Sequence, residues 1–217
     1  MNWFTKKIII HRWLGRFKSF FLTFLFNKQS YHYFYHLYNS AWRNERTVEV
    51  PIIWEKVRKH QSTDVLEVGN VLAHYFPTTH QVIDKYEKGK NVKNIDVVDF
   101  KSRKKYSLIV SISTLEHIGY DESVRDSQKS KKALKKLIRH LKPGGELWVT
   151  FPLGYNPHLD KLLQKGGLPL DKLFFLKRIS LFGTWKEVPE DVIKEKPEYG
   201  FPFSNANLVC VGMLKSN

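Results

Sequence analysis

The sequence of 217 residues has a single cysteine, few acidic residues and no long hydrophobic run. A lone cysteine excludes an internal disulfide framework and a cysteine-rich zinc site. Cys210 lies in the apolar run 208–214, which is typical of a buried strand, so we expect an inert core thiol. The nine histidines show no metal-ligand spacing, and no Gly-x-Ser-x-Gly elbow occurs. The sequence therefore predicts neither a metal site nor a hydrolase of this type.

Acidic residues are absent from residues 1–28, which carry six cations: Lys6, Lys7, Arg12, Arg16, Lys18 and Lys28. In the same region, apolar side chains follow helical spacing: Trp13, Leu14, Phe17, Phe20, Phe21, Phe24 and Leu25. This pattern predicts a basic amphipathic helix, which either lids the rest of the protein or lies on an anionic membrane surface. The stretch 13–26 is too short and too charged to span a bilayer, which takes about 20 apolar residues. It also lacks the small-residue cleavage site of a secretory signal. We therefore expect a cytoplasmic protein, peripheral at the membrane if the helix binds lipid.

The charge balance, with 36 Lys and Arg against 21 Asp and Glu and a formal net charge of +15, favours an anionic partner. Nucleic acid is one candidate, because clustered cations neutralise phosphates. The aromatic stretch 31–38 could stack bases, although a buried aromatic helix face is the commoner outcome. Phosphorylated small molecules, nucleotide-sugars or lipid-linked saccharides would use the same positive field. A small-molecule or lipid-linked substrate is the preferred interpretation, and nucleic acid is the alternative.

Hydrophobic periodicity predicts alternating strands and helices in the middle of the chain. Residues 108–112 form a continuous apolar run that suits a strand covered on both faces. Helical spacing follows, from near Ser127 to before Pro143. Such alternation predicts an α/β fold with a mainly parallel, doubly wound sheet. Residues 155–198 show no clean period, so we expect an insertion over the mouth of the site. We divide the chain into a basic aromatic helical extension, residues 1–60, and an α/β domain, residues 61–217.

Four segments in a fixed order are similar to those of class I S-adenosylmethionine-dependent methyltransferases. They are Asp64-Val65-Leu66-Glu67-Val68-Gly69, the strand 80–84 that ends in an acid and leads to 94–100, the run 106–118 with its Leu-Glu-His continuation, and the Leu-Lys-Pro-Gly-Gly turn with its strand, 141–150. The resemblance covers roughly residues 62–155. It implies a Rossmann-like sheet with a C-terminal antiparallel strand over residues 208–214, and S-adenosyl-L-methionine as cofactor.

The resemblance also assigns site residues. Glu67 and Gly69 would line the methionine end of the cofactor, and Asp84 would bind the ribose hydroxyls, with Glu87 as the alternative. Asp96 and the Val97 backbone would face the adenine, with Asp99 as the alternative. Asn70 and Ser113 complete the cofactor-binding set, and His117 is the candidate catalytic base. No metal ligand is implied.

The glycine-rich loop departs from the family pattern Glu-x-Gly-x-Gly-x-Gly, because only Gly69 of its glycines is present. Asn70 tolerates the left-handed region, whereas the β-branched Val71 does not, so we expect the loop to turn differently. We expect a methyltransferase acting on a small or lipid-linked, saccharide-type or anionic acceptor. The alternatives are a binding protein of this fold without catalysis and a nucleic-acid-binding methyltransferase. The acceptor atom and the oligomeric state stay open.

Overall fold

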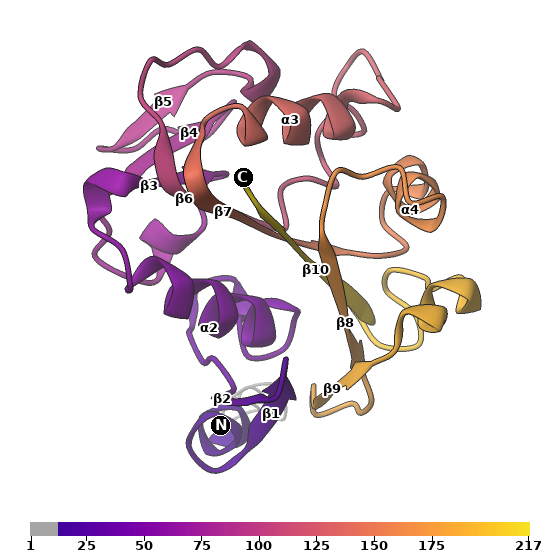
Figure 1. The fold of residues 1–217 in the computed structure, drawn as a ribbon. Helices are drawn as coiled ribbons and strands as arrows, with labels where there is room; N and C mark the ends of the chain where they lie inside the picture. The colour runs from indigo at the N-terminus through magenta and orange to yellow at the C-terminus, as the bar shows by residue number, and fades with distance from the viewer. Residues whose placement is uncertain (1–12) are drawn as a thin grey trace.

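The structure is a computed structural model that describes residues 13–217. An eight-stranded sheet in the order β5-β4-β3-β6-β7-β10-β8-β9 forms its centre (Figure 1). The strands are β3 (Val65–Val68), β4 (Gln81–Asp84), β5 (Val92–Asn94), β6 (Tyr106–Ile112), β7 (Leu141–Pro152), β8 (Lys172–Arg178), β9 (Trp185–Val188) and β10 (Leu208–Lys215). The first five in spatial order, β5 to β7, pair in parallel, whereas β10 runs antiparallel to both β7 and β8.

The strand order confirms the expected doubly wound, Rossmann-like fold. The chain moves outward from β3 to β4 and β5, and then returns to place β6 on the other side of β3. Val65 pairs with Leu108, so β3 and β6 are parallel neighbours, as the apolar runs predicted. The expected closing strand is also present as β10. The order reverses at β3, and ligands of such sheets bind in the crevice beyond the carboxyl ends of the strands at this point.

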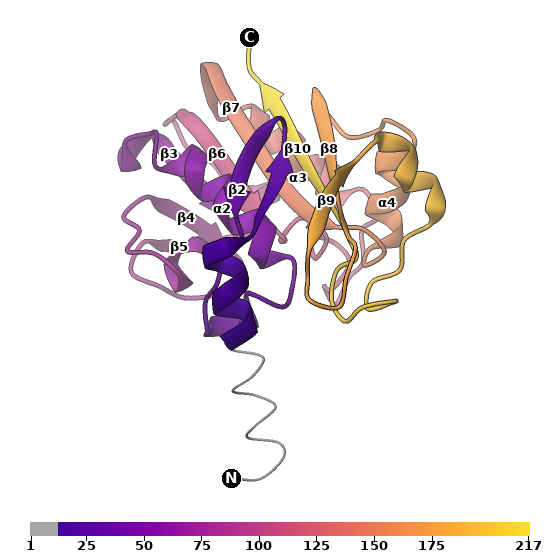
Figure 2. The same cartoon turned by 90° about the horizontal axis from the view of Figure 1, so that it is seen from below.

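Helices cover both faces of the sheet (Figures 1 and 2). One face carries α2 (Arg46–Val57) with the hairpin β1 (Thr23–Phe26) and β2 (Gln29–His32), and the other carries α3 (Lys129–Ile138) and α4 (Pro157–Gln164). Short 3-10 turns complete the fold: η1 (Tyr38–Ser40), η2 (Ser62–Asp64), η3 (Leu72–His74), η4 (Val97–Asp99) and η5 (Glu190–Glu195). Asn156 caps α4, because its Oδ1 accepts from the amides of His158 and Leu159 at 3.0 and 3.1 Å.

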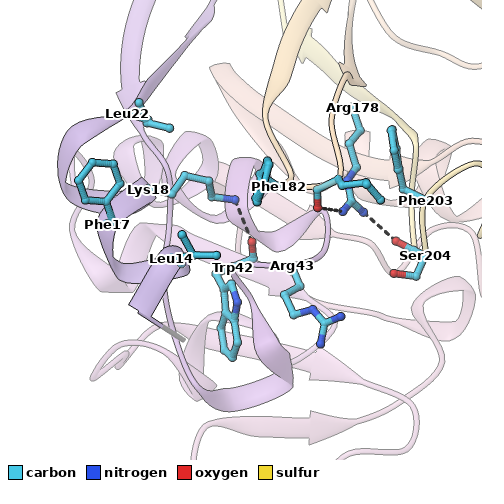
Figure 3. Close-up of a pocket in the computed structure, with 12 residues that line it drawn as sticks. Leu14, Phe17, Lys18, Leu22, Trp42, Arg43, Arg178, Phe182, Phe203 and Ser204 are labelled. Carbon is cyan, nitrogen blue, oxygen red and sulfur yellow. Dashed lines mark hydrogen bonds between the residues drawn. The ribbon is translucent and has the colours of Figure 1, made fainter. Parts of the chain in front are cut away.

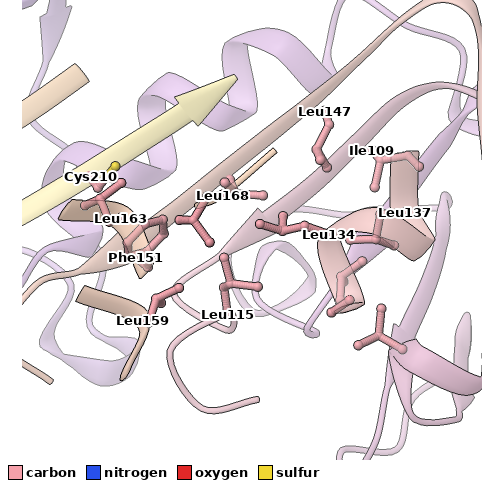
Figure 4. Packing of buried hydrophobic residues seen from close by; sticks show 14 of the residues in the cluster. Ile109, Leu115, Leu134, Leu137, Leu147, Phe151, Leu159, Leu163, Leu168 and Cys210 are labelled. Atoms are coloured by element: carbon pink, nitrogen blue, oxygen red, sulfur yellow. The ribbon is translucent and has the colours of Figure 1, made fainter. Parts of the chain in front are cut away.

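Two hydrophobic clusters hold these layers together. On the α3 and α4 face, Leu134 and Leu137 of α3 pack with sheet residues that include Ile109, Leu147 and Cys210 (Figure 4). The cysteine is fully buried and free, and burial raises the pKa of its thiol well above the ordinary value, as expected for an inert core thiol. On the opposite face, residues of α2 and of the β1–β2 hairpin share one cluster with β6, β7 and β10.

The expected N-terminal helix is shorter than its hydrophobic spacing predicted. Residues 13–21 are helical, but Phe24 and Leu25 belong to the strand β1, so the prediction of a helix through these two residues is wrong. Thr23 to Phe26 alternate between exposed and buried, a period of two, which places Phe24 in the core and Leu25 outside. Lys6, Lys7 and Arg12, which the sequence analysis counts among the cations of this basic helix, lie outside the described residues. Among residues 13–217, no helix combines the length and the apolar character of a membrane span.

Two further expectations are corrected by strand pairing. The stretch 31–38 is not a helix face, because the buried Tyr31 lies in β2 and the buried Tyr33 lies in a segment without regular secondary structure. Residues 155–198 are more than an insertion, because they contain α4 and also β8, which pairs with β10 inside the main sheet. β2 pairs with β1 in a hairpin across residues 27–28, whereas the partner of β8 lies at the C-terminal end of the chain and leaves no local signal. The division into residues 1–60 and 61–217 stays a prediction.

Candidate functional site at the sheet switch point

A cavity of about 240 Å³ lies at the carboxyl ends of the parallel strands, where the strand order reverses. Its wall is formed by the ends of the parallel strands β3 and β4 and by the segments that follow β3, β4, β5 and β6. The lining residues are Val68, Gly69, Asn70, Val71, Ile83, Asp84, Lys85, Tyr86, Glu87, Ile95, Asp96, Val97, Thr114, His117, Ile118 and Glu122. The cavity is thus lined both by apolar side chains and by charged and amide groups.

The loop after β3 needs only one left-handed residue, and Gly69 supplies it with φ of +85°. A Cβ at this position would lie 2.1 Å from Thr114 Oγ1, so no larger residue fits. Val71 has φ of −101°, in the right-handed helical region, and the chain passes directly into η3. The missing glycines are therefore explained: the loop turns once at Gly69 and then becomes helical, which a β-branched residue tolerates.

Glu67 holds this loop from behind. Its side chain is fully buried, and Oε1 accepts from the amides of Val71 and Leu72 at 2.9 and 2.8 Å. Oε2 lies 2.6 Å from His80 Nε2, which is also buried. Glu67 does not line the cavity, although the resemblance implied that it would. Its hydrogen bonds instead hold in place the loop after β3, which does line the cavity.

Asp84 lies at the end of β4 and gathers three backbone amides. Oδ2 accepts from Asn70 at 3.1 Å, and Oδ1 accepts from Tyr86 and Glu87 at 2.8 and 2.7 Å. Glu87 also lines the cavity, where its Oε1 accepts from Asn70 Nδ2 at 3.0 Å. Asn70 Oδ1 is buried and has no hydrogen-bond partner among the described residues. A buried amide oxygen without a donor at a cavity wall marks a place where a ligand donor would be stabilised.

Asp96 follows β5 and forms one corner of a four-charge network. Its Oδ2 lies 2.6 Å from Lys129 Nζ and 3.0 Å from Lys85 Nζ, and both lysines also contact Glu122 at 2.5 and 2.6 Å. Burial opposes ionisation, but hydrogen bonds from the two lysines prevail and lower the pKa of Asp96 below its ordinary value. The competing candidate Asp99 is exposed and does not line the cavity.

His117 lies at the cavity wall beyond β6, and its side chain is 47% exposed. Its Nδ1 lies 2.5 Å from Asp121 Oδ2, which also accepts a hydrogen bond from the Tyr155 hydroxyl at 2.8 Å. Burial raises the pKa of Asp121, but the bonds from His117 and Tyr155 outweigh it and leave the pKa below its ordinary value. The carboxylate thus orients the imidazole, an arrangement that suits a group handling a proton.

Ser113 lies behind the cavity in a buried polar cluster. Its Oγ donates to Glu49 Oε1 at 2.7 Å, and Glu49 pairs with Arg46 of the same helix at 2.5 Å. Glu116, 1% exposed, lies next to this cluster, and its Oε2 has no partner among the described residues. Burial raises the pKa of Glu116 well above the ordinary value. These contacts join α2 to the end of β6.

The structure therefore brings six of the eight predicted site residues to one cavity and places Glu67 and Ser113 behind it. Sequence reasoning missed several lining residues, among them Lys85, Thr114 and Glu122. Lys85 could have been found, because it directly follows the predicted strand 80–84, and so could Thr114, which lies just beyond the predicted run 108–112. Glu122 could not, since it lies in no predicted strand and reaches the wall beside its ion pairs with Lys85 and Lys129. Among residues 13–217, no group of three or more His, Cys, Asp or Glu side chains could hold a metal ion.

Comparison with known proteins gives structural neighbours only. No protein-family model matches the chain, and no curated protein matches it. Among solved structures, the N-methyltransferase NodS from Bradyrhizobium japonicum, in complex with S-adenosyl-L-homocysteine, is similar at a TM-score of 0.48 and 12% identity, covering 79% of this chain and 87% of its own. A possible histamine N-methyltransferase from Thermotoga maritima reaches 0.47 and 15%, covering 81% and 94%. The sugar N-methyltransferase KedS8 from Streptoalloteichus reaches 0.41 and 14%, covering 85% and 94%.

Proposed function

We propose that this protein is an S-adenosylmethionine-dependent methyltransferase whose cofactor binds in the switch-point cavity. The observation that carries the proposal is the position of the cavity. It lies beyond β3, β4 and β5 of a doubly wound sheet, with a glycine turn after β3 and an acid at the end of β4. These are the places where such a sheet binds a nucleotide-type ligand.

The lining residues fit the parts of this cofactor. Ile95, Val97 and Ile118 offer apolar surface for a purine, and Asp84 offers carboxylate oxygens to ribose hydroxyls. The unpartnered Asn70 Oδ1 is an acceptor that an ammonium group would satisfy. The volume of about 240 Å³ is below the 300–1,000 Å³ common for sites of drug-sized ligands. The cavity therefore suits the nucleoside part of the cofactor. Binding of the remainder requires the side chains of Tyr86 and Glu87, which line the cavity, to move aside.

When bound, the cofactor supplies an activated methyl group on sulfur. The chain then has two tasks, which are to position an acceptor and to remove its proton. His117 is placed for the second task, because it lies at the cavity wall and Asp121 fixes its orientation. The proposed acceptor is a small or lipid-linked molecule, of saccharide type or anionic, since the net charge of +15 favours anionic substrates.

We also propose that the protein associates peripherally with anionic membrane surfaces. The support is the exposure of the helix 13–21, where Trp13, Phe20 and Phe21 are 65%, 70% and 71% exposed. A helix that served only as a lid would bury these side chains. Arg16 is exposed on the same helix and would face anionic head groups.

Calorimetric titration with S-adenosyl-L-homocysteine tests the cofactor assignment without knowledge of the acceptor. We expect one site per chain and a thermal stabilisation that grows with ligand concentration, about 2.7 kcal/mol at 100 times the dissociation constant. Adenosine should bind more weakly, because it lacks the amino acid that Asn70 would satisfy. A folded protein that binds neither ligand at millimolar concentration would contradict the proposal. Binding without turnover of any acceptor would instead support the alternative of a binding protein.

A further inference from the structure

A second and larger cavity, about 500 Å³, lies away from the switch point between the helix 13–21 and the end of β8. Its volume falls within the range of ordinary ligand sites, and it shares no lining residue with the first cavity. Apolar side chains form most of the wall. The lining residues are Leu14, Gly15, Phe17, Lys18, Leu22, Trp42, Arg43, Arg178, Leu181, Phe182, Phe203 and Ser204 (Figure 3).

Three cations and no acid line this cavity. Arg43 is exposed, whereas Lys18 and Arg178 are only 4% and 7% exposed. Among the described residues, neither buried cation has a carboxylate within ion-pair distance, and residues 1–12 contain no Asp or Glu that could supply one. Burying a charge without a counter-charge is costly. An anion in the cavity would offset that cost.

Backbone carbonyls hold both buried cations in place and leave donors free. Lys18 Nζ donates to the carbonyls of Trp42 and Gly183 at 2.8 and 3.1 Å, which uses two of its three N–H groups. Arg178 donates to three carbonyls, those of Ser180, Leu181 and Ser204, out of five N–H groups. Burial and the neighbouring Arg178 lower the pKa of Lys18 to about 7, as expected for two cations in one poorly hydrated place. The fold therefore holds both side chains at the cavity, where a bound anion would favour the charged form of Lys18.

Several apolar side chains that line the cavity are also exposed to solvent. Leu181 and Phe182, in the turn after β8, are 78% and 70% exposed, and Phe17 of the helix 13–21 is 44% exposed. Large exposed apolar groups around a site mark contact with a partner or a membrane. An apolar rim, an apolar wall and unpaired cations together select a molecule that carries both an alkyl chain and a negative charge.

We propose that this cavity binds the head group and part of the chain of an anionic, phosphate-bearing lipid presented by a membrane surface. The alkyl chain packs on Leu14, Phe17 and Phe182, and the anionic group lies near Arg43, Lys18 and Arg178. The proposal does not rest on methyl transfer, because the site is separate from the switch-point cavity. It also differs from general attraction to a charged bilayer, since it requires one saturable site per chain.

Titration of the full chain with decyl phosphate, kept below its critical micelle concentration, tests the site directly. We expect saturable binding of one molecule per chain, and binding at least about tenfold weaker for decyl maltoside, which has the same chain and no charge. Inorganic phosphate alone should not saturate. Equal binding of the charged and uncharged amphiphiles, or no binding of decyl phosphate, would overturn the proposal.

A matched pair of charge reversals separates the site from the general field. Arg43→Glu changes an exposed residue at the cavity, and Lys101→Glu makes the same charge change at an exposed position that lines neither cavity. We expect the first to weaken decyl phosphate binding about tenfold or more, and the second to change it by less than about twofold. Similar losses in both variants would show a non-specific field and would overturn the proposal.

Vesicles distinguish a membrane lipid from a free amphiphile. With phosphatidylglycerol in phosphatidylcholine vesicles, Arg43→Glu should reduce co-sedimentation more than Lys101→Glu does. Phe182→Ser should also reduce it, and Val124→Ser, at a residue 79% exposed outside both cavities, should not. If the variants affect decyl phosphate but leave vesicle binding unchanged, the membrane source is wrong. None of these measurements depends on S-adenosylhomocysteine, so failure here and failure of the cofactor assignment are distinguishable.

Discussion

The backbone amide of Asn70 donates to the Asp84 carboxylate at 3.1 Å and so ties the loop after β3 to the end of β4. With the amides of Tyr86 and Glu87, three donors occupy a group that has about four acceptor positions. These three bonds hold the carboxylate in one orientation. The carboxylate keeps one free acceptor position for a ribose hydroxyl. A second hydrogen bond from the ribose would have to share or replace the bond from the Asn70 amide.

Removing this carboxylate should abolish most cofactor binding. A hydrogen bond to a charged group contributes about 1.5–3 kcal/mol, so loss of the ribose contacts in Asp84→Ala should weaken S-adenosyl-L-homocysteine binding by about ten- to a hundredfold. Glu87→Ala is the matched control, because Glu87 lines the same cavity and is not assigned to the ribose. Calorimetric titration of both variants, each first shown to unfold cooperatively, checks the prediction. A larger loss in Glu87→Ala would transfer the ribose role to that residue.

Gly69→Ala should be strongly destabilising. A side chain at φ of +85° costs about 1–2 kcal/mol, and the overlap with Thr114 Oγ1 at 2.1 Å adds roughly 1–3 kcal/mol. Thr114→Ala removes part of that overlap, although it also removes the bond from Thr114 Oγ1 to the Ile112 carbonyl. Urea unfolding of the two single variants and the double variant measures the coupling. Simple additivity of the two changes would show that the close approach does not cause the loss.

Asp160 predicts a pH dependence of stability that can be isolated. Burial raises the pKa of this carboxyl to about 6, and its Oδ1 is buried without a partner among the described residues. The folded protein thus holds a proton that the unfolded chain releases near pH 4, so stability falls as the pH rises from about 4 to 6 and then levels off.

Asp160→Asn removes this titration and keeps an oxygen that can accept from the Gly154 amide. The variant should be more stable than the parent at pH 8, by at most about 3 kcal/mol, and should lose that advantage at pH 4.5. Urea unfolding at the two pH values gives the comparison. A difference between variant and parent that is the same at both values would exclude Asp160 as the cause.

The proposed membrane association depends on the exposed face of the helix 13–21. Phe20→Ser together with Phe21→Ser should reduce co-sedimentation with anionic vesicles, because burying a phenylalanine contributes about 1.5–3 kcal/mol. The substitutions are preferable to deleting residues 1–28, which would remove Phe24 and Phe26 from the core. Val124→Ser serves as the control at an exposed apolar residue elsewhere. Unchanged sedimentation of the double variant, or binding that salt does not weaken, would count against the proposal.

The sequence by itself determined the parallel part of the sheet and most of the candidate site. Continuous apolar runs identify β3 and β6, and each candidate residue from Gly69 to His117 follows a strand end that can be read locally. Gly69, Asp84, Asp96 and His117 line one cavity, because parallel strands bring their carboxyl ends to the same edge.

Only the tertiary structure decided the features that depend on pairing between segments. The spacing around Phe24 predicted a helix, but residues 23–26 pair with β2 in a hairpin, and β8 is part of the sheet through its pairing with β10. Lys18 donates to the carbonyl of Gly183, 165 positions further along the chain, and this contact leaves no signal in the segment that carries the lysine. Periodicity records which face of an element is buried, whereas pairing and charge neutralisation depend on which segments come to lie side by side.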